Sequence, residues 1–186
     1  MAAEVRGVLV SAMKAYLSKT YGPDAVERAT ATLPTEEQAL IQRKCLDASF
    51  YPYDTMIALR HLMRPLATGQ PAAADDLGAF LADYVFTGVY KPLLANDAPA
   101  MVAKITWVKD FFYRDLEKVE SAMTGDSSCR VTYRYEEKVR PARAVCRSLG
   151  NFWARTLQLA GGKKVSFAHD VCICDGADHC EFSFRW

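Results

Sequence analysis

The chain has 186 residues, of which 51% are hydrophobic and 24% are charged. These are ordinary values for a globular protein, and they exclude a disordered or collagen-like chain. The 23 basic and 22 acidic residues leave a formal charge of +1, which excludes a strong electrostatic attraction to nucleic acid or anionic lipid. The length predicts a single domain, residues 1–186, with its own hydrophobic core.

The N-terminus does not have the pattern of a targeting segment. Charged residues interrupt its apolar residues at Glu4, Arg6 and Lys14, which a signal peptide would not tolerate. No apolar run approaches the ~20 residues of a membrane helix, so we expect no membrane span. The six cysteines are therefore expected in a reducing cytoplasm, where metal binding is commoner than a disulfide framework.

Helical periodicity dominates residues 1–115. Apolar residues recur at three- and four-residue spacing, and turn residues separate the repeats. The pattern predicts helices over 5–17, 23–33, 35–44, 55–66, 75–85 and 101–112.

Residues 116–186 have a different character. Segments 118–123 and 129–136 are rich in β-forming residues and are joined by a turn, and 163–174 and 181–186 form a second such pair. Between the pairs, Pro141 is well placed to begin a helix that runs to Leu159. The predicted fold is therefore α+β: a helical N-terminal half, then β-β-α-β-β forming a small antiparallel sheet.

The last strand pair carries a cluster of metal-binding residue types. His169, Cys172 and Cys180 fall on two sides of one predicted hairpin, and Cys146 in the preceding helix is the obvious fourth ligand. Thiolates and imidazoles in a tetrahedral set of four are typical of structural zinc sites. The spacing alone also suits buried, unreactive cysteines, and Cys174 and His179 compete for ligand positions.

The same stretch resembles the C-terminal signature of the 4-vinyl reductase-type domain. The residues that carry the resemblance are His169, Cys172, Gly176, Cys180, Phe182, Phe184 and Trp186, with Pro141, Cys146, Gly161 and Gly162 upstream. That family includes the sensory domains of phenol- and xylene-responsive bacterial activators. It is structurally related to the TRAPP vesicle-tethering subunits and to haem-based nitric oxide sensors. The match covers about residues 100–186 and implies a TRAPP/NO-sensor-like ligand-binding fold.

The resemblance also implies a cofactor. Aromatic-sensing members of the 4-vinyl reductase-type family bind zinc through three cysteines and one glutamate. Cys146, Cys172 and Cys180 match the cysteine positions, while His169 stands at the glutamate position. A Cys₃His set is a common structural zinc site, so Zn(2+) is the expected cofactor, tying the last helix to the hairpin.

A ligand pocket is a further expectation from the resemblance. The sensory relatives hold an aromatic effector in a cavity, and the candidate lining residues here are Trp107, Phe111, Tyr133 and Trp153. For any one of them taken alone, an ordinary core aromatic is the commoner case.

Haem is not expected from the sequence. His61 lies in a predicted helix and is the nearest candidate ligand, but a lone helical histidine is more often a surface or core residue. The Tyr-x-Ser-x-Arg motif of haem-based sensors is also absent. The most similar stretch of the sequence is Tyr133-Arg134-Tyr135, which does not match.

The sequence therefore predicts a zinc-stabilised, cytoplasmic module that senses a hydrophobic or aromatic small molecule. Its signal would pass through a homodimer or a separate protein partner. The alternatives are an adaptor of the TRAPP type with no small ligand, and a tetrapyrrole-related enzyme. We do not expect an enzyme, because the sequence has no nucleophile elbow and no phosphate-binding glycine loop.

Overall fold

The computed structural model describes residues 3–31, 34–66, 73–136 and 143–186. Its α-helices are α1 (Gly7–Tyr21), α2 (Ala25–Thr30), α3 (Thr35–Gln42), α4 (Asp54–Leu66), α5 (Ala73–Thr87), α6 (Ala98–Phe112) and α7 (Arg143–Leu159). Its strands are β1 (Glu4–Arg6), β2 (Phe50–Pro52), β3 (Tyr113–Arg114), β4 (Glu117–Gly125), β5 (Ser128–Tyr135), β6 (Ser166–Val171) and β7 (Cys180–Arg185). Two short 3₁₀ helices, η1 (Lys91–Leu93) and η2 (Ile173–Asp175), complete the described elements.

The larger sheet is antiparallel, with the strand order β4-β5-β7-β6. Side chains alternate between its two faces, as the period of a strand requires. The inward face of β5 and β7 carries the buried residues Cys129, Val131, Tyr133, Cys180, Phe182 and Phe184. The predicted α+β class and the small antiparallel sheet are therefore confirmed.

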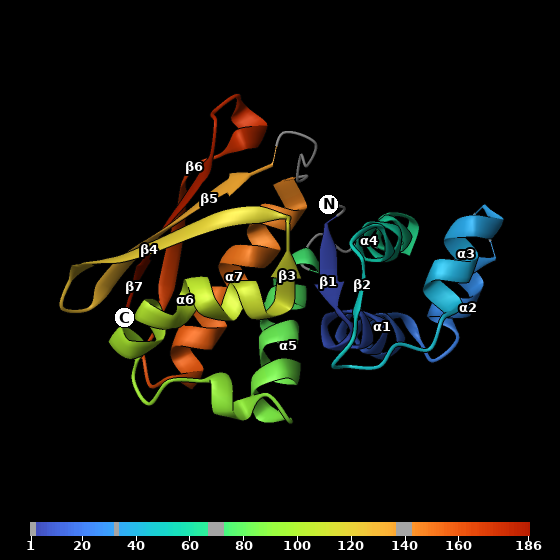
Figure 1. Ribbon diagram of the computed structural model, residues 1–186, viewed down its shortest axis with the longest axis horizontal. Coiled ribbons are helices and arrows are strands. Elements are labelled where there is room, and N and C mark those ends of the chain that lie inside the picture. The colour runs from blue at the N-terminus through green and yellow to red at the C-terminus, as the bar shows by residue number, and fades with distance from the viewer. Residues whose placement is uncertain (1–2, 32–33, 67–72, 137–142) are drawn as a thin grey trace.

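Two helices cover the inward face of this sheet, which arches over them (Figure 1). Helix α6 lies along β4, and its Thr106 hydroxyl donates to the carbonyl of Val119 at 3.0 Å. Helix α7 buries Phe152, Trp153 and Leu157 beneath the strands. The core is thus a sheet packed on α6 and α7, and α5 packs against α7 in turn.

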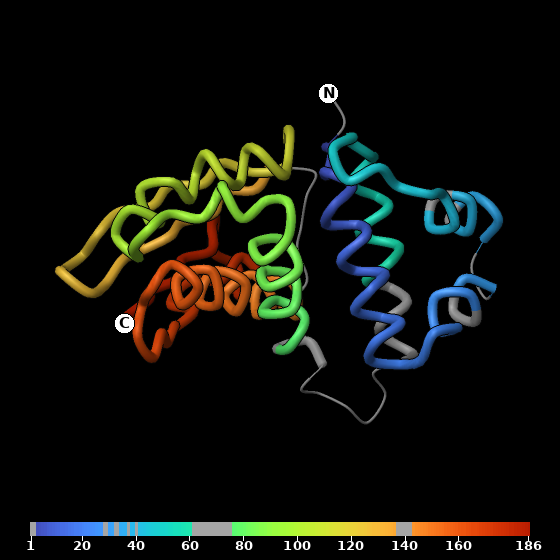
Figure 2. Tube along the Cα trace, turned by 90° about the horizontal axis from the view of Figure 1, so that it is seen from below, coloured from blue at the N-terminus to red at the C-terminus, as the bar shows by residue number. Residues whose placement is uncertain are grey.

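Helices α5 and α7 approach each other unusually closely. A Cβ atom on Gly78 of α5 would lie 1.9 Å from the carbonyl oxygen of Ser148 and 2.8 Å from the nitrogen of Phe152, both in α7. Only glycine permits that contact. Figure 2 shows α5 beside α7 on one side and facing α1 on the other.

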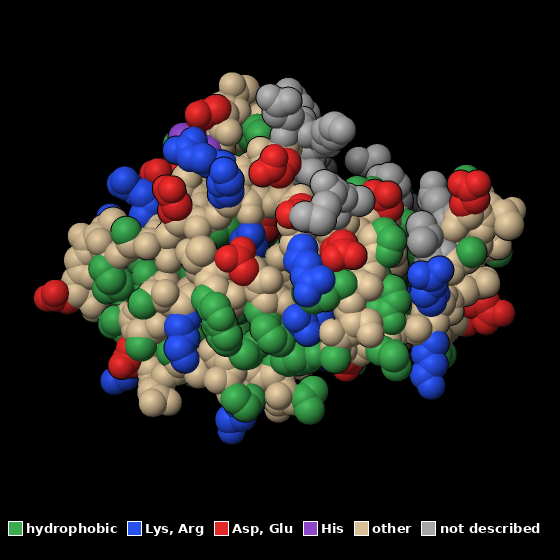
Figure 3. Space-filling view, viewed as in Figure 1, with side chains coloured by type: hydrophobic (Ala, Val, Ile, Leu, Met, Phe, Trp, Pro, Cys, Tyr) green, Lys and Arg blue, Asp and Glu red, His purple; other side chains and the backbone are tan. Residues whose placement is uncertain are grey.

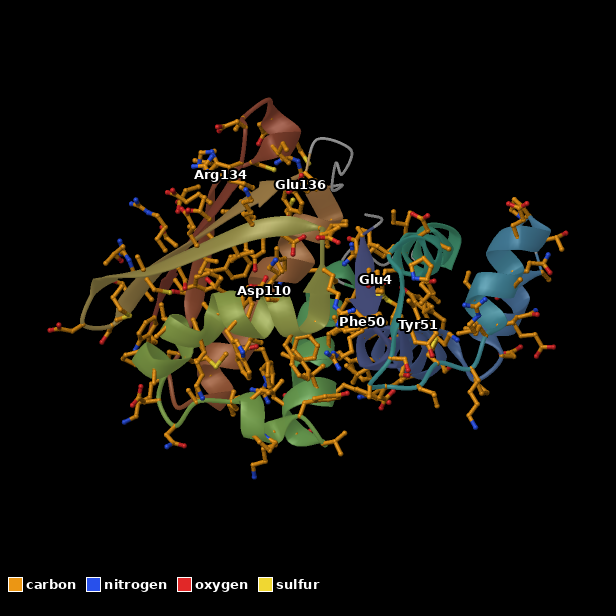
Figure 4. The ribbon with its side chains drawn as sticks, viewed as in Figure 1. Glu4, Phe50, Tyr51, Asp110, Arg134 and Glu136 are labelled. Carbon is orange, nitrogen blue, oxygen red and sulfur yellow. The ribbon has the colours of Figure 1, made fainter. Side chains whose placement is uncertain are left out.

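A second, three-stranded sheet joins the two halves of the chain. Its order is β2-β1-β3, so the first strand of the chain pairs with the short strand that follows α6. Arg6 of β1 lies between two rings, 4.4 Å from the centroid of Phe50 and 3.9 Å from that of Phe111. Its Nε also donates to the carbonyl of Phe111 at 2.8 Å. Glu4 and Phe50 are labelled at this boundary in Figure 4.

Several predicted boundaries were wrong. The strand predicted over 163–174 is shorter, because it ends at Val171 and the chain turns into η2. The helix predicted over 23–33 is Ala25–Thr30. Strands β1, β2 and β3 were not predicted. Pro141, the predicted start of α7, lies outside the described residues.

No described helix has the length and apolar character needed to cross a membrane. The buried hydrophobic residues of the described segments form one contiguous cluster that runs from β1 to β7.

Candidate metal-binding cluster

The structure brings together the four residues that the sequence singled out. The candidate ligand atoms of Cys146, His169, Cys172 and Cys180 all lie within 4.8 Å of one another. We call this set the thiol–imidazole cluster. Its three cysteines are buried and its histidine is half-buried, so the ligand atoms are held away from bulk water.

Three elements place the cluster. Cys146 lies in the first turn of α7, while His169 stands near the end of β6 opposite Phe182 of β7. Cys180 begins β7. Between β6 and β7, Cys172 precedes η2, and Gly176 closes that turn in the left-handed region at φ 93°. The turn folds Cys172 back toward Cys180.

Backbone N–H groups point at two of the sulfur atoms. The N–H of Ile173 donates to Cys180 Sγ at 3.4 Å, and the N–H of Cys174 donates to Cys172 Sγ at 3.4 Å. Such bonds stabilise the thiolate over the thiol, because they favour the charged form. At Cys180 this bond helps to lower the pKa of the thiol, whereas at Cys172 burial outweighs it and the pKa is raised.

The electrostatics of the cluster favour one thiolate. Cys146 and Cys180 lie 3.8 Å apart, sulfur to sulfur. Hydrogen bonding from Cys146 lowers the pKa of Cys180 to about 5, assisted by the N–H of Ile173 and by His169. The same hydrogen bond raises the pKa of Cys146, and burial adds to that effect. A cation would meet a thiolate that is already formed at neutral pH.

His169 carries a polar atom with no partner. Its Nε2 is buried and has no hydrogen-bond partner among the described residues. Its ring stacks on Phe182, with centroids 4.3 Å apart and planes 9° from parallel. A buried unsatisfied nitrogen is costly, and a metal ion held by the cluster would remove that cost.

The two competing ligands are not members of the thiol–imidazole cluster. Cys174 is exposed, and His179 pairs with Asp178. Arg143, at the start of α7, forms an ion pair with Asp175 and so tethers the turn to the helix from outside.

The four candidate pocket residues divide into two pairs. Trp107 is 53% exposed and contacts Phe111, with ring centroids 6.1 Å apart. These residues lie on α6, over which hydrophobic side chains gather on the face shown in Figure 3. Tyr133 and Trp153 are buried, and the indole N–H of Trp153 donates to the Tyr133 hydroxyl. No described ring contact or hydrogen bond joins the two pairs directly, and their place in a ligand pocket stays a prediction.

Sequence reasoning missed a second group of polar residues. Glu117, which is 7% exposed, and Arg60, which is half-buried, belong to it. The available signal was a charge at a core-facing position of a patterned helix or strand, which is rare without a partner.

No family model and no curated protein matches the sequence. Solved structures do match along the whole chain. An H-NOX protein from S. oneidensis in the Fe(II)NO state has 16% identity and a TM-score of 0.67, covering 97% of this chain and 98% of that one. Fe(II) unliganded H-NOX from K. algicida has 14% identity and a TM-score of 0.66, covering 97% and 95%. The chain has the H-NOX fold.

A third H-NOX domain is described as oxygen-binding and related to soluble guanylate cyclases. It has 10% identity and a TM-score of 0.66, covering 97% of this chain and 94% of that one. At these identities the likeness establishes the fold alone.

The H-NOX fold corrects the resemblance drawn from the sequence. The 4-vinyl reductase-type and TRAPP assignment was wrong, because the structural neighbours are H-NOX domains. The C-terminal signature misled because a cysteine hairpin after a helix does not distinguish these folds. The expected Zn(2+) cofactor and the zinc-stabilised sensor of hydrophobic ligands are withdrawn with it. The neighbours are described with Fe(II), NO, CO, oxygen and haem, and not as tethering adaptors or tetrapyrrole enzymes.

Proposed function

We propose that the chain is a sensory domain of the H-NOX fold whose input site is the thiol–imidazole cluster. The cluster holds a metal ion that prefers sulfur and nitrogen ligands. The observation that carries this proposal is the convergence of four such ligand atoms within 4.8 Å. His169, a member of the cluster, also has a buried Nε2 without a hydrogen-bond partner among the described residues. Ligand type alone leaves open which soft or borderline metal is bound.

The fold supports the sensory role. The match to proteins described with NO, CO and oxygen extends over 97% of this chain. Their fold is therefore present as a whole and not as a fragment. A fold hosts many functions, so the site decides the chemistry.

Haem, which the description of one neighbour names, does not fit the described residues. Haem iron takes histidine, cysteine thiolate or tyrosine as its axial ligand, with methionine usually beside histidine. His169 belongs to the cluster, and His179 is paired with Asp178. Burial raises the pKa of Tyr113 and of Tyr133, which opposes a tyrosinate ligand. The side chain of His61 lies outside the described residues, so we derive no step through haem.

Metal content tests the proposal directly. Elemental mass spectrometry of tag-free protein would compare the native chain with Cys180→Ser and with Cys45→Ser, a matched change outside the cluster. We expect one first-row transition-metal ion per chain in the native protein and in Cys45→Ser. The Cys180→Ser variant should lose it, because one of the four ligand atoms is removed.

Two results would overturn the proposal. One is a well-folded native protein that takes up no metal when supplied with Co²⁺, whose thiolate complexes absorb visibly. The other is stoichiometric haem that responds to NO or CO while the cluster stays metal-free, which would make the chain a haem-based gas sensor.

The proposal also states where the domain acts and how its signal is passed on. We place the domain in the cytoplasm, where cysteines stay reduced and able to bind metal. Its signal passes through a homodimer or a protein partner, and residues 1–186 act as one domain.

A further inference from the structure

The side of α6 that faces away from the core carries an exposed tryptophan. Residues at three- and four-residue spacing share one face of a helix, and on this side they are Ala103, Lys104, Trp107, Asp110 and Phe111. We call these five residues the outer face of α6. Trp107 is 53% exposed, and the opposite side of the helix is buried. Tryptophan is the residue type most often found at the centre of a protein interface.

Apolar surface continues from Trp107 to the segment before α6. The half-buried ring of Phe111 lies 6.1 Å from that of Trp107 and 5.6 Å from that of Tyr90, centroid to centroid. Val89, the neighbour of Tyr90 in sequence, is 81% exposed. Figure 3 shows the hydrophobic side chains that gather over α6. Exposed apolar side chains that gather in one place, with charged residues beside them, are typical of a protein interaction site.

The order of residues on the outer face fits a second copy of the same helix. When two identical helices pack antiparallel about a twofold axis at Trp107, residues equally far before and after that position lie opposite each other. Lys104, three residues before Trp107, then faces Asp110, three residues after it. Ala103 faces Phe111 in the same way, so a small side chain lies opposite a large one. The axis repeats each pair, and both charge pairs are attractive.

Both charged side chains are accessible to a partner. Lys104 is exposed, and the side chain of Asp110 is 62% exposed. Asp110 pairs within its own chain with Lys109 at 2.7 Å, and the buried Lys109 also donates to the carbonyl of Glu117. A carboxylate accepts several hydrogen bonds, so this contact leaves room for a second ammonium group. It also holds the carboxylate in place, which lowers the cost of ordering it in an interface.

We propose that two copies of this chain form an antiparallel, twofold-symmetric dimer through the outer face of α6. Trp107 lies at the axis, and Lys104 of each copy pairs with Asp110 of the other. The proposal rests on the sensory function proposed above, because it names a second copy of the chain as the signalling partner. The aromatic centre supplies the affinity, and the charges set the orientation. Parallel helices would instead place Lys104 against Lys104 and Asp110 against Asp110.

Sedimentation velocity of the full chain at a series of protein concentrations measures the dimer. The native protein should pass from monomer to dimer as its concentration rises. Trp107→Ala should raise the dissociation constant at least about tenfold, because it removes the centre of the interface. Leu46→Ala is the matched control. It also truncates an exposed apolar side chain, 64% exposed and outside α6, and should leave the dissociation constant unchanged.

Charge exchange tests the antiparallel pairing itself. Lys104→Glu places a carboxylate opposite Asp110, and Asp110→Lys places an ammonium opposite Lys104. Each variant alone should therefore dimerise at least about tenfold more weakly than the native protein. An equal mixture of the two variants should dimerise within about threefold of the native protein, because both pairs of the mixed dimer again have opposite charges. Lys44→Glu, which reverses an exposed charge outside α6, should have no effect.

Three results would overturn the inference. The native protein could stay monomeric, which would leave the outer face of α6 to a different protein partner. Trp107→Ala or either charge variant alone could dimerise as the native protein does. The mixture could remain as weak as its two components. Metal analysis of the same samples separates the two proposals, since a metal-bound monomer contradicts only the dimer and a metal-free dimer contradicts only the metal site.

Discussion

Glu117 is a carboxyl group in an interior position. Burial raises its pKa to about 7 from 4.5, although Lys109 and Arg60 oppose the rise, and Asp110 adds slightly to it. Lys109 also donates to the backbone carbonyl of Glu117, and Tyr135 faces it from β5. The protonated form is therefore favoured in the folded chain over the unfolded one.

This shift sets a pH dependence with a definite sign. Between about pH 4.5 and pH 7 the folded chain binds the proton more tightly, so the contribution of Glu117 to stability is largest at low pH. It falls as pH rises through about 7 and is constant above it. Glu117→Gln imitates the neutral form and should be more stable than the native protein at pH 8, by up to about 3 kcal/mol.

Urea unfolding at pH 5 and pH 8 measures the effect. The advantage of the variant should shrink toward pH 5. Glu120→Gln, an exposed change on the same strand, serves as the control and should show no such trend. An advantage for Glu117→Gln that is equal at both pH values would contradict the assignment.

The packing of α5 on α7 depends on one residue without a side chain. Gly78→Ala would place a methyl group 1.9 Å from the carbonyl of Ser148, and that neighbour is helix backbone that cannot yield. We expect a loss of about 3 kcal/mol or more in unfolding free energy, since overpacking forces the helices apart. Thermal unfolding followed by circular dichroism would show it.

Gly88→Ala is the matched control for this substitution. Gly88 is exposed, and its nearest atom is 3.3 Å away on the carbonyl of Tyr84. The unfolding free energy should change by less than about 1 kcal/mol. Equal effects of the two substitutions would mean that the close approach of α5 and α7 is not maintained in solution.

Elements with long periodic patterns were predictable from the sequence, and short ones were not. The stripe from Val5 to Leu17 predicted α1, and the alternation of Phe182 and Phe184 predicted β7, because burial on one face leaves a repeat in the sequence. Strands of two or three residues, such as Tyr113–Arg114, leave no repeat. They form because distant segments supply their hydrogen bonds.

Functional sites, like helices and strands, were predictable only where their residues leave a local pattern in the sequence. The thiol–imidazole cluster was predictable because His169, Cys172 and Cys180 are close in sequence and have rare chemistry. The polar group that includes Arg60 and Glu117 was not, since its members come from segments that are far apart in the sequence. The exposure of Trp107 was not predicted. Trp107 and Val108 are adjacent and both apolar, so the sequence does not show which of the two faces the core.

The two halves of the molecule share one core. The contiguous buried cluster, the β2-β1-β3 sheet and the stack of Arg6 on Phe50 and Phe111 all cross between them. We therefore expect the whole chain to unfold in a single cooperative step. Calorimetry should give equal calorimetric and van't Hoff enthalpies, and two resolved transitions would show that the halves are independent.

The hydrogen bond from Trp153 to Tyr133 gives the protein an internal optical reporter. Trp153 is almost fully buried, whereas Trp107 is half exposed, so their fluorescence differs in wavelength and in access to soluble quenchers. Tyr133 adjoins Cys180 in the register of the sheet, which places the buried indole one side chain from the sulfur atoms. We therefore expect the emission of Trp153 to change with the state of those sulfur atoms, without any attached dye.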